Sequence, residues 1–151
     1  MKYNIRIAIP SDEEKICELF LEMLRTIYHT DEVDGYKDGA LDRFWTGDEN
    51  RIYVAEDRVI VAFLSIEVHH EHEDYIYLDD FSVTEAYRNK GIGSELLNVA
   101  ESYAREINIP EVFLHVEKTN GAAMRLYERF GYSINRDDGN RYLLRKNLLS
   151  Q

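Results

Sequence analysis

The sequence predicts an α/β protein with a meander of strands in the middle of the chain and strand–helix units after it. Three observations support this fold class. Apolar residues alternate with polar ones over residues 3–9, as in a half-buried strand. They recur every three or four residues from Ile16 and again from Leu96, as in amphipathic helices. Short apolar runs bounded by turn residues fill residues 51–83.

The first half of the chain is predicted to hold one strand, one long helix and an acidic loop. Ser11 follows the strand at residues 3–9, and Ser11 with Glu14 has the spacing of a capping box at a helix start. One face of this helix is apolar: Ile16, Leu19, Phe20, Met23, Leu24 and Ile27. An acidic, glycine-punctuated loop then covers residues 31–39, and a short helix is expected at residues 40–45.

Strands fill the middle of the chain. Residues 51–56 and 58–68 are predicted to be two strands joined by a tight turn at Asp57. A polar segment at residues 69–74 then leads into a third strand at residues 75–83.

Strand–helix units complete the chain. A helix is expected from about Ser94, and Pro110 lies just beyond its end, as suits a residue that cannot continue a helix. A second helix begins at Asn120 and ends at Gly131. Three short strands complete the prediction: residues 112–116, 132–135 and 141–146.

The composition limits the class of partner. The chain has 151 residues with a hydrophobic fraction of 44%, which suits one domain with one core. Its formal net charge of -11 disfavours nucleic acid and favours a cationic partner or substrate, although acidic surfaces also simply keep proteins soluble. Cys17 is the single cysteine, no apolar run is long enough to span a membrane, and residues 1–6 lack the apolar block of a signal peptide. These features predict a cytoplasmic protein.

The segment Arg88-Asn89-Lys90-Gly91-Ile92-Gly93 lies between a predicted strand and a predicted helix. A glycine-rich turn at a helix start presents unpaired N–H groups and the positive end of the helix dipole, which together bind phosphate well. The missing Cβ atoms of Gly91 and Gly93 let a ligand approach the backbone. A dinucleotide fingerprint fits less well, because position 96 is Leu where that motif needs a third glycine.

This segment resembles the acyl-CoA signature of the GNAT family of N-acetyltransferases, Arg/Gln-x-x-Gly-x-Gly/Ala. Downstream, the run from Asn120 through Ala123, Leu126 and Tyr127 to Gly131-Tyr132 resembles the second motif of that family. The order of elements fits over essentially the whole chain. Leu78-Asp79-Asp80-Phe81 is most similar to enzymes that act on polyamine-type substrates.

The resemblance implies one acyl-CoA N-acyltransferase domain over residues 1–151. It implies an α/β fold with a mixed, mostly antiparallel, twisted sheet flanked by helices, and acetyl-CoA as the cofactor. Proteins that resemble this one commonly pair through terminal strands, which would give a homodimer.

The resemblance also implies which residues hold acetyl-CoA. The N–H groups of residues 90–94 would hold the pyrophosphate, and the backbone of residues 81–83 would pair with the pantetheine arm as an added strand. Asn120 would cap a helix and contact the cofactor. The expected cofactor residues are Phe81, Ser82, Val83, Arg88, Asn89, Lys90, Gly91, Ile92, Gly93, Ser94 and Asn120.

Acetyl transfer to an amine needs a proton acceptor for the amine and a proton donor for the leaving thiolate. The resemblance makes Tyr127 the donor, although an aromatic residue in an apolar helix stripe also serves as core. Asp79 is the expected base and Glu67 on the neighbouring strand is a second candidate; a solvated or salt-bridged acid is the alternative for Asp79. Because Asp79 and Asp80 are adjacent in a strand, at most one of them is expected to face the site.

The acceptor is predicted to be a small cationic amine such as a polyamine or an aminoglycoside. No Lys or Arg occurs between Arg58 and Arg88, and a second acidic cluster lies in the loop at residues 31–38. The expected substrate-binding residues are Asp34, Tyr36 and Asp79, with Phe44 and Trp45 as further walls.

Alternatives remain open at this point. They are an N-terminal or lysine peptide acetyltransferase and a non-catalytic acyl-CoA-binding module. No metal is expected, because His69, His70 and His72 match no standard zinc spacing, and His115 is expected to be structural.

Overall fold

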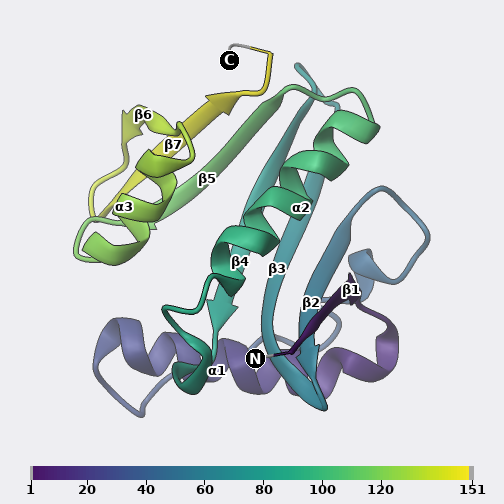
Figure 1. The fold of residues 1–151 in the computed structure, drawn as a ribbon, viewed down its shortest axis with the longest axis vertical. Helices are drawn as coiled ribbons and strands as arrows, with labels where there is room; N and C mark the ends of the chain where they lie inside the picture. The colour runs from purple at the N-terminus through teal and green to yellow at the C-terminus, as the bar shows by residue number, and fades with distance from the viewer. Residues whose placement is uncertain (1, 150–151) are drawn as a thin grey trace.

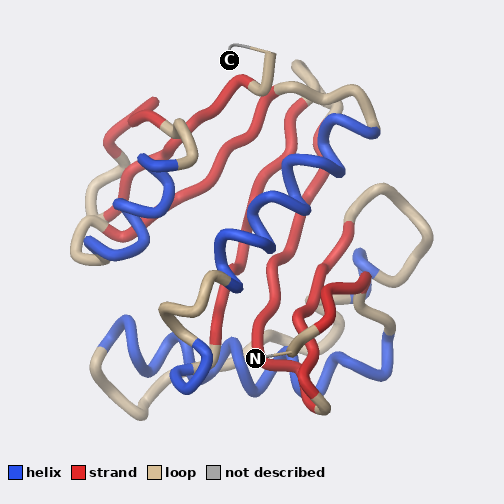
Figure 2. The backbone as a smooth tube through the Cα atoms, viewed as in Figure 1, coloured by secondary structure: helices blue, strands red, loops and turns tan. Residues whose placement is uncertain are grey.

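The computed structural model describes residues 2–149, which form one seven-stranded sheet with helices on both faces (Figures 1 and 2). The strand order is β1-β2-β3-β4-β5-β7-β6, in which β4 and β5 are parallel and all other neighbours are antiparallel. The predicted mixed, mostly antiparallel sheet is therefore confirmed. The strands are β1 (Asn4–Ile7), β2 (Arg51–Asp57), β3 (Val59–His69), β4 (Tyr75–Val83), β5 (Glu111–Glu117), β6 (Ser133–Asp137) and β7 (Arg141–Asn147).

Three α-helices cover the sheet within the described chain: α1 (Glu13–Tyr28), α2 (Ile92–Glu106) and α3 (Gly121–Arg129). Figure 1 shows α2 in front of the central strands and α1 behind their lower ends. Short 3-10 turns occupy Pro10–Asp12, Asp42–Phe44 and Glu85–Tyr87. Within residues 2–149, no helix combines the length and apolar character needed to cross a lipid bilayer.

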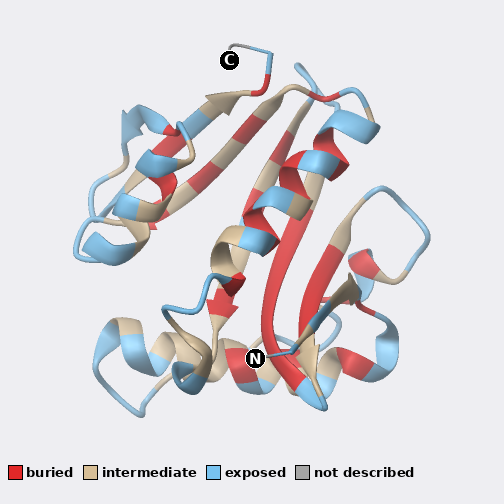
Figure 3. Cartoon of the chain, viewed as in Figure 1, coloured by how far each residue is buried: buried red, intermediate tan, exposed pale blue. Residues whose placement is uncertain are grey.

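The alternation of side chains along the strands produces two hydrophobic clusters, one on each face of the sheet. On β2, Tyr53 and Ala55 join the cluster under α2, whereas Ile52 and Val54 join the cluster under α1. Figure 3 shows buried residues concentrated in the central strands and on the inner side of α2. Both faces of β2 and β3 are buried, which explains their near-continuous apolar sequences.

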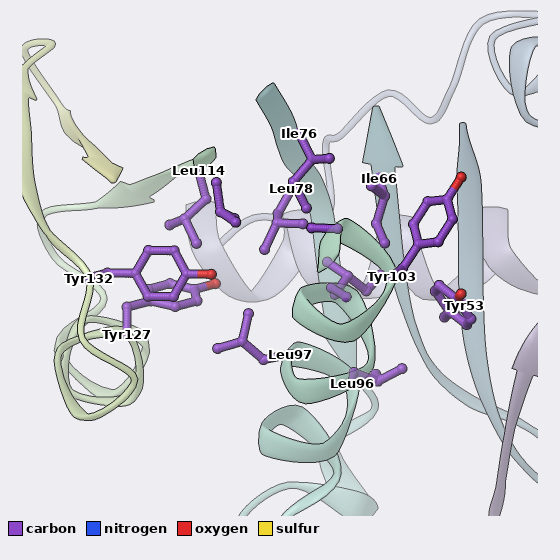
Figure 4. Packing of buried hydrophobic residues seen from close by; sticks show 14 of the residues in the cluster. Tyr53, Ile66, Ile76, Leu78, Leu96, Leu97, Tyr103, Leu114, Tyr127 and Tyr132 are labelled. Atoms are coloured by element: carbon purple, nitrogen blue, oxygen red, sulfur yellow. The ribbon is translucent and has the colours of Figure 1, made fainter. Parts of the chain in front are cut away.

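The larger cluster lies between α2 and the sheet and continues under α3. Figure 4 shows Leu97 of α2 on the side of Tyr127 and Tyr132, and Leu96 on the opposite side of the helix, toward Tyr53. The charged residue Glu101 of α2 is buried beside this cluster, with 3% of its surface exposed. Its carboxylate accepts a hydrogen bond from Tyr132 at 2.9 Å and pairs with Lys146 at 2.8 Å, so the buried charge is compensated.

A bulge interrupts the pairing of β3 with β4. Leu64 faces Phe81 and Ile66 faces Leu78, so two residues of β4, Asp79 and Asp80, lie opposite Ser65. The hydroxyl of Ser65 accepts a hydrogen bond from the Asp80 N–H at 2.9 Å, which satisfies an amide that the regular ladder leaves unpaired. Ser65 thus stabilises the bulge.

Beyond the bulge, β4 separates from β5. The two strands pair from Ile76–Leu78 to Val112–Leu114, and Figure 1 shows them diverging below that point. Residues 81–83 keep their partners on β3, but within residues 2–149 no strand pairs with their other edge. This open edge lies between α2 and α3 on one face and near α1 on the other.

The predicted capping box at Ser11 and Glu14 is wrong. Residues 10–12 form a 3-10 turn, and α1 begins one residue later, at Glu13. The carboxylate of Asp12 accepts the N–H of Ile9 at 2.8 Å and pairs with Arg6 at 2.8 Å, so Asp12 organises this turn instead. The short helix expected at residues 40–45 is likewise a 3-10 turn, and α2 begins at Ile92 rather than Ser94.

Candidate active site

Two cavities lie on opposite sides of β4 and meet where this strand leaves β5. The glycine-loop cavity, of about 500 Å³, lies between residues 81–94 and α3. The acidic cavity, of about 240 Å³, lies between α1 and the strands β4, β5 and β7. Both cavities are lined by Phe81, Asn120, Ala123 and Tyr127. A ligand in one cavity therefore reaches a ligand in the other at these shared residues.

The wall of the glycine-loop cavity contains most of the residues predicted to bind the cofactor. These are Phe81, Val83, Arg88, Asn89, Gly91, Ile92, Gly93, Ser94 and Asn120. The side chain of Asn120 caps α3 by accepting the N–H of Ala123 at 3.2 Å.

The start of α2 provides the anion-binding end of this cavity. Gly91 is the N-cap of α2 with φ of +87°, a left-handed conformation that side chains rarely adopt. A Cβ atom at Gly91 would meet nothing within 4 Å, so this backbone is open to a ligand. The first N–H groups of α2 have no partner within the helix and point out of its N-terminus, which favours a phosphate.

Three predicted cofactor residues have different surroundings from those expected. Arg88 lines the cavity, but its Nε donates to the Val83 carbonyl at 2.8 Å and its Nη2 pairs with Glu22 at 3.2 Å. Its guanidinium therefore holds the loop against α1. Lys90 is exposed and does not line the cavity. The Ser82 hydroxyl donates to the Leu19 carbonyl, so Ser82 offers its backbone and not its side chain.

Tyr127 lies at the junction of the two cavities. Its side chain is 7% exposed, and its ring packs beside Phe81 and Tyr132, with centroids at 6.5 and 5.9 Å. Burial raises the pKa of Tyr127 above its usual value, which keeps the hydroxyl protonated. Within residues 2–149 its hydroxyl has no hydrogen-bond partner, and Figure 4 shows it pointing from α3 toward α2. The hydroxyl is thus available to a ligand.

The acidic cavity has an apolar wall and a charged floor. The apolar wall is the inner side of α1: Phe20, Met23, Leu24 and Ile27. The floor carries Asp79 and Asp80 of β4, His115 and Glu117 of β5, and Arg141 of β7. This combination suits an amphipathic cation, with its methylene groups on the helix and its charge on the strands.

Asp79 and Asp80 both line the acidic cavity, so the expectation that at most one of them faces the site is wrong. The bulge breaks the alternation on which that expectation depended. Burial, with the nearby charges of Asp80 and Glu67, raises the pKa of Asp79 to about 6. Burial also raises the pKa of Asp80, while a hydrogen bond from Tyr36 at 2.5 Å opposes the shift.

Of the other residues predicted on the acceptor side, Tyr36 and Glu67 contact residues of the site, whereas Asp34 does not line the cavity. Tyr36 stacks on Phe20 with centroids 3.9 Å apart, and its hydroxyl reaches Asp80. Glu67 lies beside the cavity, where its two oxygens contact Arg43 at 2.9 Å and His69 at 3.0 Å. Asp34 is exposed and does not line the cavity.

Phe44 and Trp45 do not wall the cavity, contrary to expectation. Phe44 is 8% exposed in the core cluster under α1, and the Trp45 indole donates to Glu13 at 2.9 Å.

His115, expected to be structural, is the residue that sequence reasoning missed. It lines the acidic cavity, its Nδ1 lies 2.5 Å from the Tyr77 hydroxyl and its Nε2 lies 2.7 Å from Asp138. A carboxylate at Nε2 favours a proton there and leaves Nδ1 as the acceptor from Tyr77. The alternation of residues in β5 could have located His115. Val112, Leu114 and Val116 are buried on one face of the strand, so residue 115 faces the other side.

Two histidines of residues 69–74 have aromatic or acidic neighbours. His69 stacks on Tyr75, and His70 contacts Glu49 and Asp74. In the part of the chain that the structure describes, no group of three or more His, Cys, Asp or Glu residues is placed to hold a metal ion.

A helix N-terminus beside an open strand edge, joined to a second cavity at a buried tyrosine, defines the class of protein. The chain matches the Acetyltransferase (GNAT) family over residues 16–132, and it belongs to that family. The order of strands and helices and the two sequence motifs agree with this assignment.

The chain is also similar to individual proteins. It is 33% identical over 61 residues, 40% of each chain, to the spermine/spermidine N(1)-acetyltransferase of Bacillus subtilis. The fold matches the PaiA N-acetyltransferase of Thermoplasma acidophilum in complex with coenzyme A, with a TM-score of 0.81, 19% identity and coverage of 97% and 99%. It also matches Arabidopsis thaliana NAA60 in complex with a bisubstrate analogue, with a TM-score of 0.72, 22% identity and coverage of 97% and 98%. The chain spans about half the length of the curated relatives it matches.

Proposed function

We propose that the protein is an acetyl-CoA-dependent N-acetyltransferase that acts on a primary amine of a small cationic acceptor. The observation that carries this proposal is the junction at Tyr127, where the glycine-loop cavity opens into the acidic cavity. Membership of the GNAT family supports the reaction, and the net charge of -11 supports a cationic acceptor.

The residues of the glycine-loop cavity fit acetyl-CoA. The first N–H groups of α2 and the open backbone at Gly91 suit the pyrophosphate. The unpaired edge of residues 81–83 suits the amide groups of the pantetheine arm, which would add to β4 as a strand adds to a sheet edge. When bound, acetyl-CoA supplies the acetyl group as an activated thioester.

The remaining chemistry falls to side chains at the junction. At neutral pH an amine carries a proton and is a poor nucleophile, so a base must accept that proton. Asp79 is the proposed base, because a carboxylate with a pKa of about 6 is ionised at neutral pH and still accepts a proton. Glu67 is the second candidate. The protonated hydroxyl of Tyr127 would donate a proton to the leaving sulfur after direct attack by the amine in a ternary complex.

The acidic cavity supports an alkyl polyamine as the acceptor. The apolar side of α1 faces the carboxylates of β4 across a narrow space, which fits a methylene chain that ends in ammonium groups. The relation to a spermine/spermidine acetyltransferase points the same way.

A peptide amine is the second candidate acceptor. The apolar wall of α1 would also accept the first side chain of a peptide, with the terminal ammonium at Asp79. His115, which contacts Tyr77, lines the same cavity as Asp79, so this pair is a further candidate for proton transfer. The fold shared with NAA60 is compatible with this alternative.

A panel of acceptors tests the proposal. CoA-thiol release from acetyl-CoA would be measured with spermidine, spermine, 1,4-diaminobutane, butylamine, an aminoglycoside, lysine and short peptides. We expect acceptor-dependent release that is faster with 1,4-diaminobutane than with butylamine, because the second ammonium binds the acidic floor. Faster release with peptides than with diamines would favour the second candidate. Acetyl-CoA binding without release for any amine would contradict the enzyme and favour a binding module.

A further inference from the structure

Arg43 bridges two acids of the sheet beside the acidic cavity. Its Nη2 atom lies 2.9 Å from Oε2 of Glu67 and 3.4 Å from Oδ2 of Asp79. Glu67 and Asp79 belong to the neighbouring strands β3 and β4, whereas Arg43 belongs to the 3-10 turn between α1 and β2. A cation from a loop therefore lies against both proposed bases.

Arg43 approaches these acids from the solvent side. Its side chain is 40% exposed, compared with 20% for Glu67 and 32% for Asp79. The guanidinium also lies 4.4 Å from the centroid of the Phe44 ring and donates to the Ala40 carbonyl, both within its own loop. Ion pairs this exposed typically contribute about 1 kcal/mol or less to stability. The fold therefore loses little if another cation takes the place of Arg43.

The loop that carries Arg43 also supplies a hydrogen-bond donor to the third acid, Asp80. Tyr36 donates a hydrogen bond to Asp80 at 2.5 Å and packs on Phe20 of α1. One segment, residues 36–43, thus supplies a partner to each of Glu67, Asp79 and Asp80. An acceptor cation that pairs with these acids would compete with partners that are already present.

We infer that Arg43 occupies the place of an acceptor ammonium and competes with cationic acceptors for Glu67 and Asp79. This inference rests on the proposed function. The guanidinium reduces the negative potential of the floor, so each ammonium group of an acceptor gains less on binding than it would without Arg43. Arg43 thereby limits affinity for multiply charged amines and determines how strongly the site distinguishes them from monoamines.

Replacement of Arg43 by Gln tests this inference. The dissociation constants of 1,4-diaminobutane and butylamine would be measured by isothermal titration calorimetry at low ionic strength with CoA present. We expect Arg43→Gln to bind the diamine about 10-fold more tightly and butylamine about 3-fold more tightly, because the dication responds more to the change in potential. Unchanged or weaker diamine binding would overturn the inference, since a guanidinium that orders the site or contacts an acceptor anion gives that result.

Lys37 provides the matched control. It lies in the same loop, is exposed and makes no ion pair within the described residues, so Lys37→Gln removes the same charge without uncovering an acid. We expect Lys37→Gln to change diamine affinity by less than about 2-fold. An equal increase in diamine affinity in Lys37→Gln and Arg43→Gln would overturn the specific role of Arg43. Arg43→Lys keeps the charge and should bind the diamine as the unmodified protein does, which separates charge from loop structure.

These measurements test the role of Arg43 separately from the proposed acetyltransferase function. Calorimetry reads amine binding without turnover, so it tests Arg43 even if no amine in the panel is acetylated. Turnover of a diamine by the unmodified protein, together with unchanged affinity in Arg43→Gln, would reject the role of Arg43 and leave the proposed function intact.

Discussion

The two cavities that meet at Tyr127 are built in different ways. The glycine-loop cavity is formed mainly by one continuous stretch, residues 81–94, and presents backbone groups: a helix N-terminus and an open strand edge. The acidic cavity is formed by side chains from α1, β4, β5 and β7, with partners from the loop before β2.

This difference predicts that the two cavities respond differently to substitution. Backbone groups bind a ligand whatever the neighbouring side chains are, so the glycine-loop cavity needs few fixed residues. Side chains that converge from distant segments change independently, and each change alters charge and shape. Substitutions in the glycine-loop cavity should therefore change acetyl-CoA binding, whereas substitutions in the acidic cavity should change acceptor chemistry. The predictions run from the largest expected effect to the smallest.

Replacement of Tyr127 by Phe should have the largest effect, because this hydroxyl serves both cavities. We expect kcat to fall about 1,000-fold, within the range for loss of a general acid, while acetyl-CoA affinity changes by less than about 2-fold. Steady-state kinetics and calorimetry check the two expectations. Tyr132→Phe is the control, since it removes a hydroxyl bonded to Glu101 and should lower the Tm without a comparable loss of kcat. A similar loss of kcat in both variants would show that packing, not proton donation, matters at Tyr127.

Replacement of Asp79 by Asn should slow acetylation at about pH 7 by about 100-fold, because it removes the proposed base. In the unmodified protein kcat/KM should rise as pH increases through about 6, where Asp79 loses its proton. A pH–rate profile of the Asn variant should lack this rise. If the rise persists, another group accepts the proton; Glu67, the second candidate, is the first to test, and the Tyr77–His115 pair is the next.

The same substitution should stabilise the protein at neutral pH. The pKa of Asp79 is raised from 3.8 to about 6 by burial first, then by Asp80 and Glu67, so the folded state binds a proton that the unfolded state releases. The stability contribution of the protonated group is present below pH 3.8 and is lost as pH rises through about 6. After allowance for partial exposure, Asp79→Asn should raise the free energy of unfolding by about 1 kcal/mol at pH 7 and change it little at pH 4. Denaturant unfolding checks this, with the exposed Asp34→Asn as the control.

Gly93→Ala should affect the glycine-loop cavity in particular. A Cβ at this position would lie 3.5 Å from Phe81 and 3.7 Å from Leu126, both of which line that cavity. The fold tolerates these contacts, but the methyl group narrows the space for a ligand. We expect KM for acetyl-CoA to rise about 10-fold, with a Tm equal or slightly higher because Ala favours a helix.

Gly121→Ala is the control for this substitution. Gly121 is also at a helix start but does not line the glycine-loop cavity, and a Cβ there would meet a flexible arginine tip at 3.3 Å. The KM of the Gly121→Ala variant for acetyl-CoA should not change. A change of the same size would mean that the effect at Gly93 arises from the helix start and not from the cavity.

The two cavities also differ in how well the sequence predicted them. Gly91, Gly93 and Asn120 act locally, through a turn or a cap whose partners lie within a few residues, so motifs located them. The acidic cavity depends on register: the pairing of Asp79 and Asp80 with one residue, Ser65, is not visible in the strand alternation. Arg43 meets Glu67 from 24 residues away, a contact that exists only after the loop folds onto the sheet.

The error at Ser11 has a similar origin. Local spacing favoured a Ser11–Glu14 box, but Arg6 on β1, which also pairs with Glu56 on β2, pairs with Asp12 and fixes the turn one residue later. A tertiary ion pair thus overrides a local capping preference. The order of strands and helices along the chain was predictable because hydrophobic periodicity indicates them, whereas side-chain partners across elements were not.

Lys90→Ala should have the smallest effect. It tests whether the glycine-loop cavity binds its ligand through backbone groups and not through the charge of Lys90. Lys90 is exposed and lies outside the cavity wall, so its charge attracts an anionic ligand only from a distance. We expect KM for acetyl-CoA to rise about 2-fold at low ionic strength and to equal that of the unmodified protein at about 0.5 M salt, where such attraction is screened. A 10-fold rise that persists in salt would show that the lysine binds the ligand directly. The contrast between backbone recognition in one cavity and side-chain recognition in the other would then no longer hold.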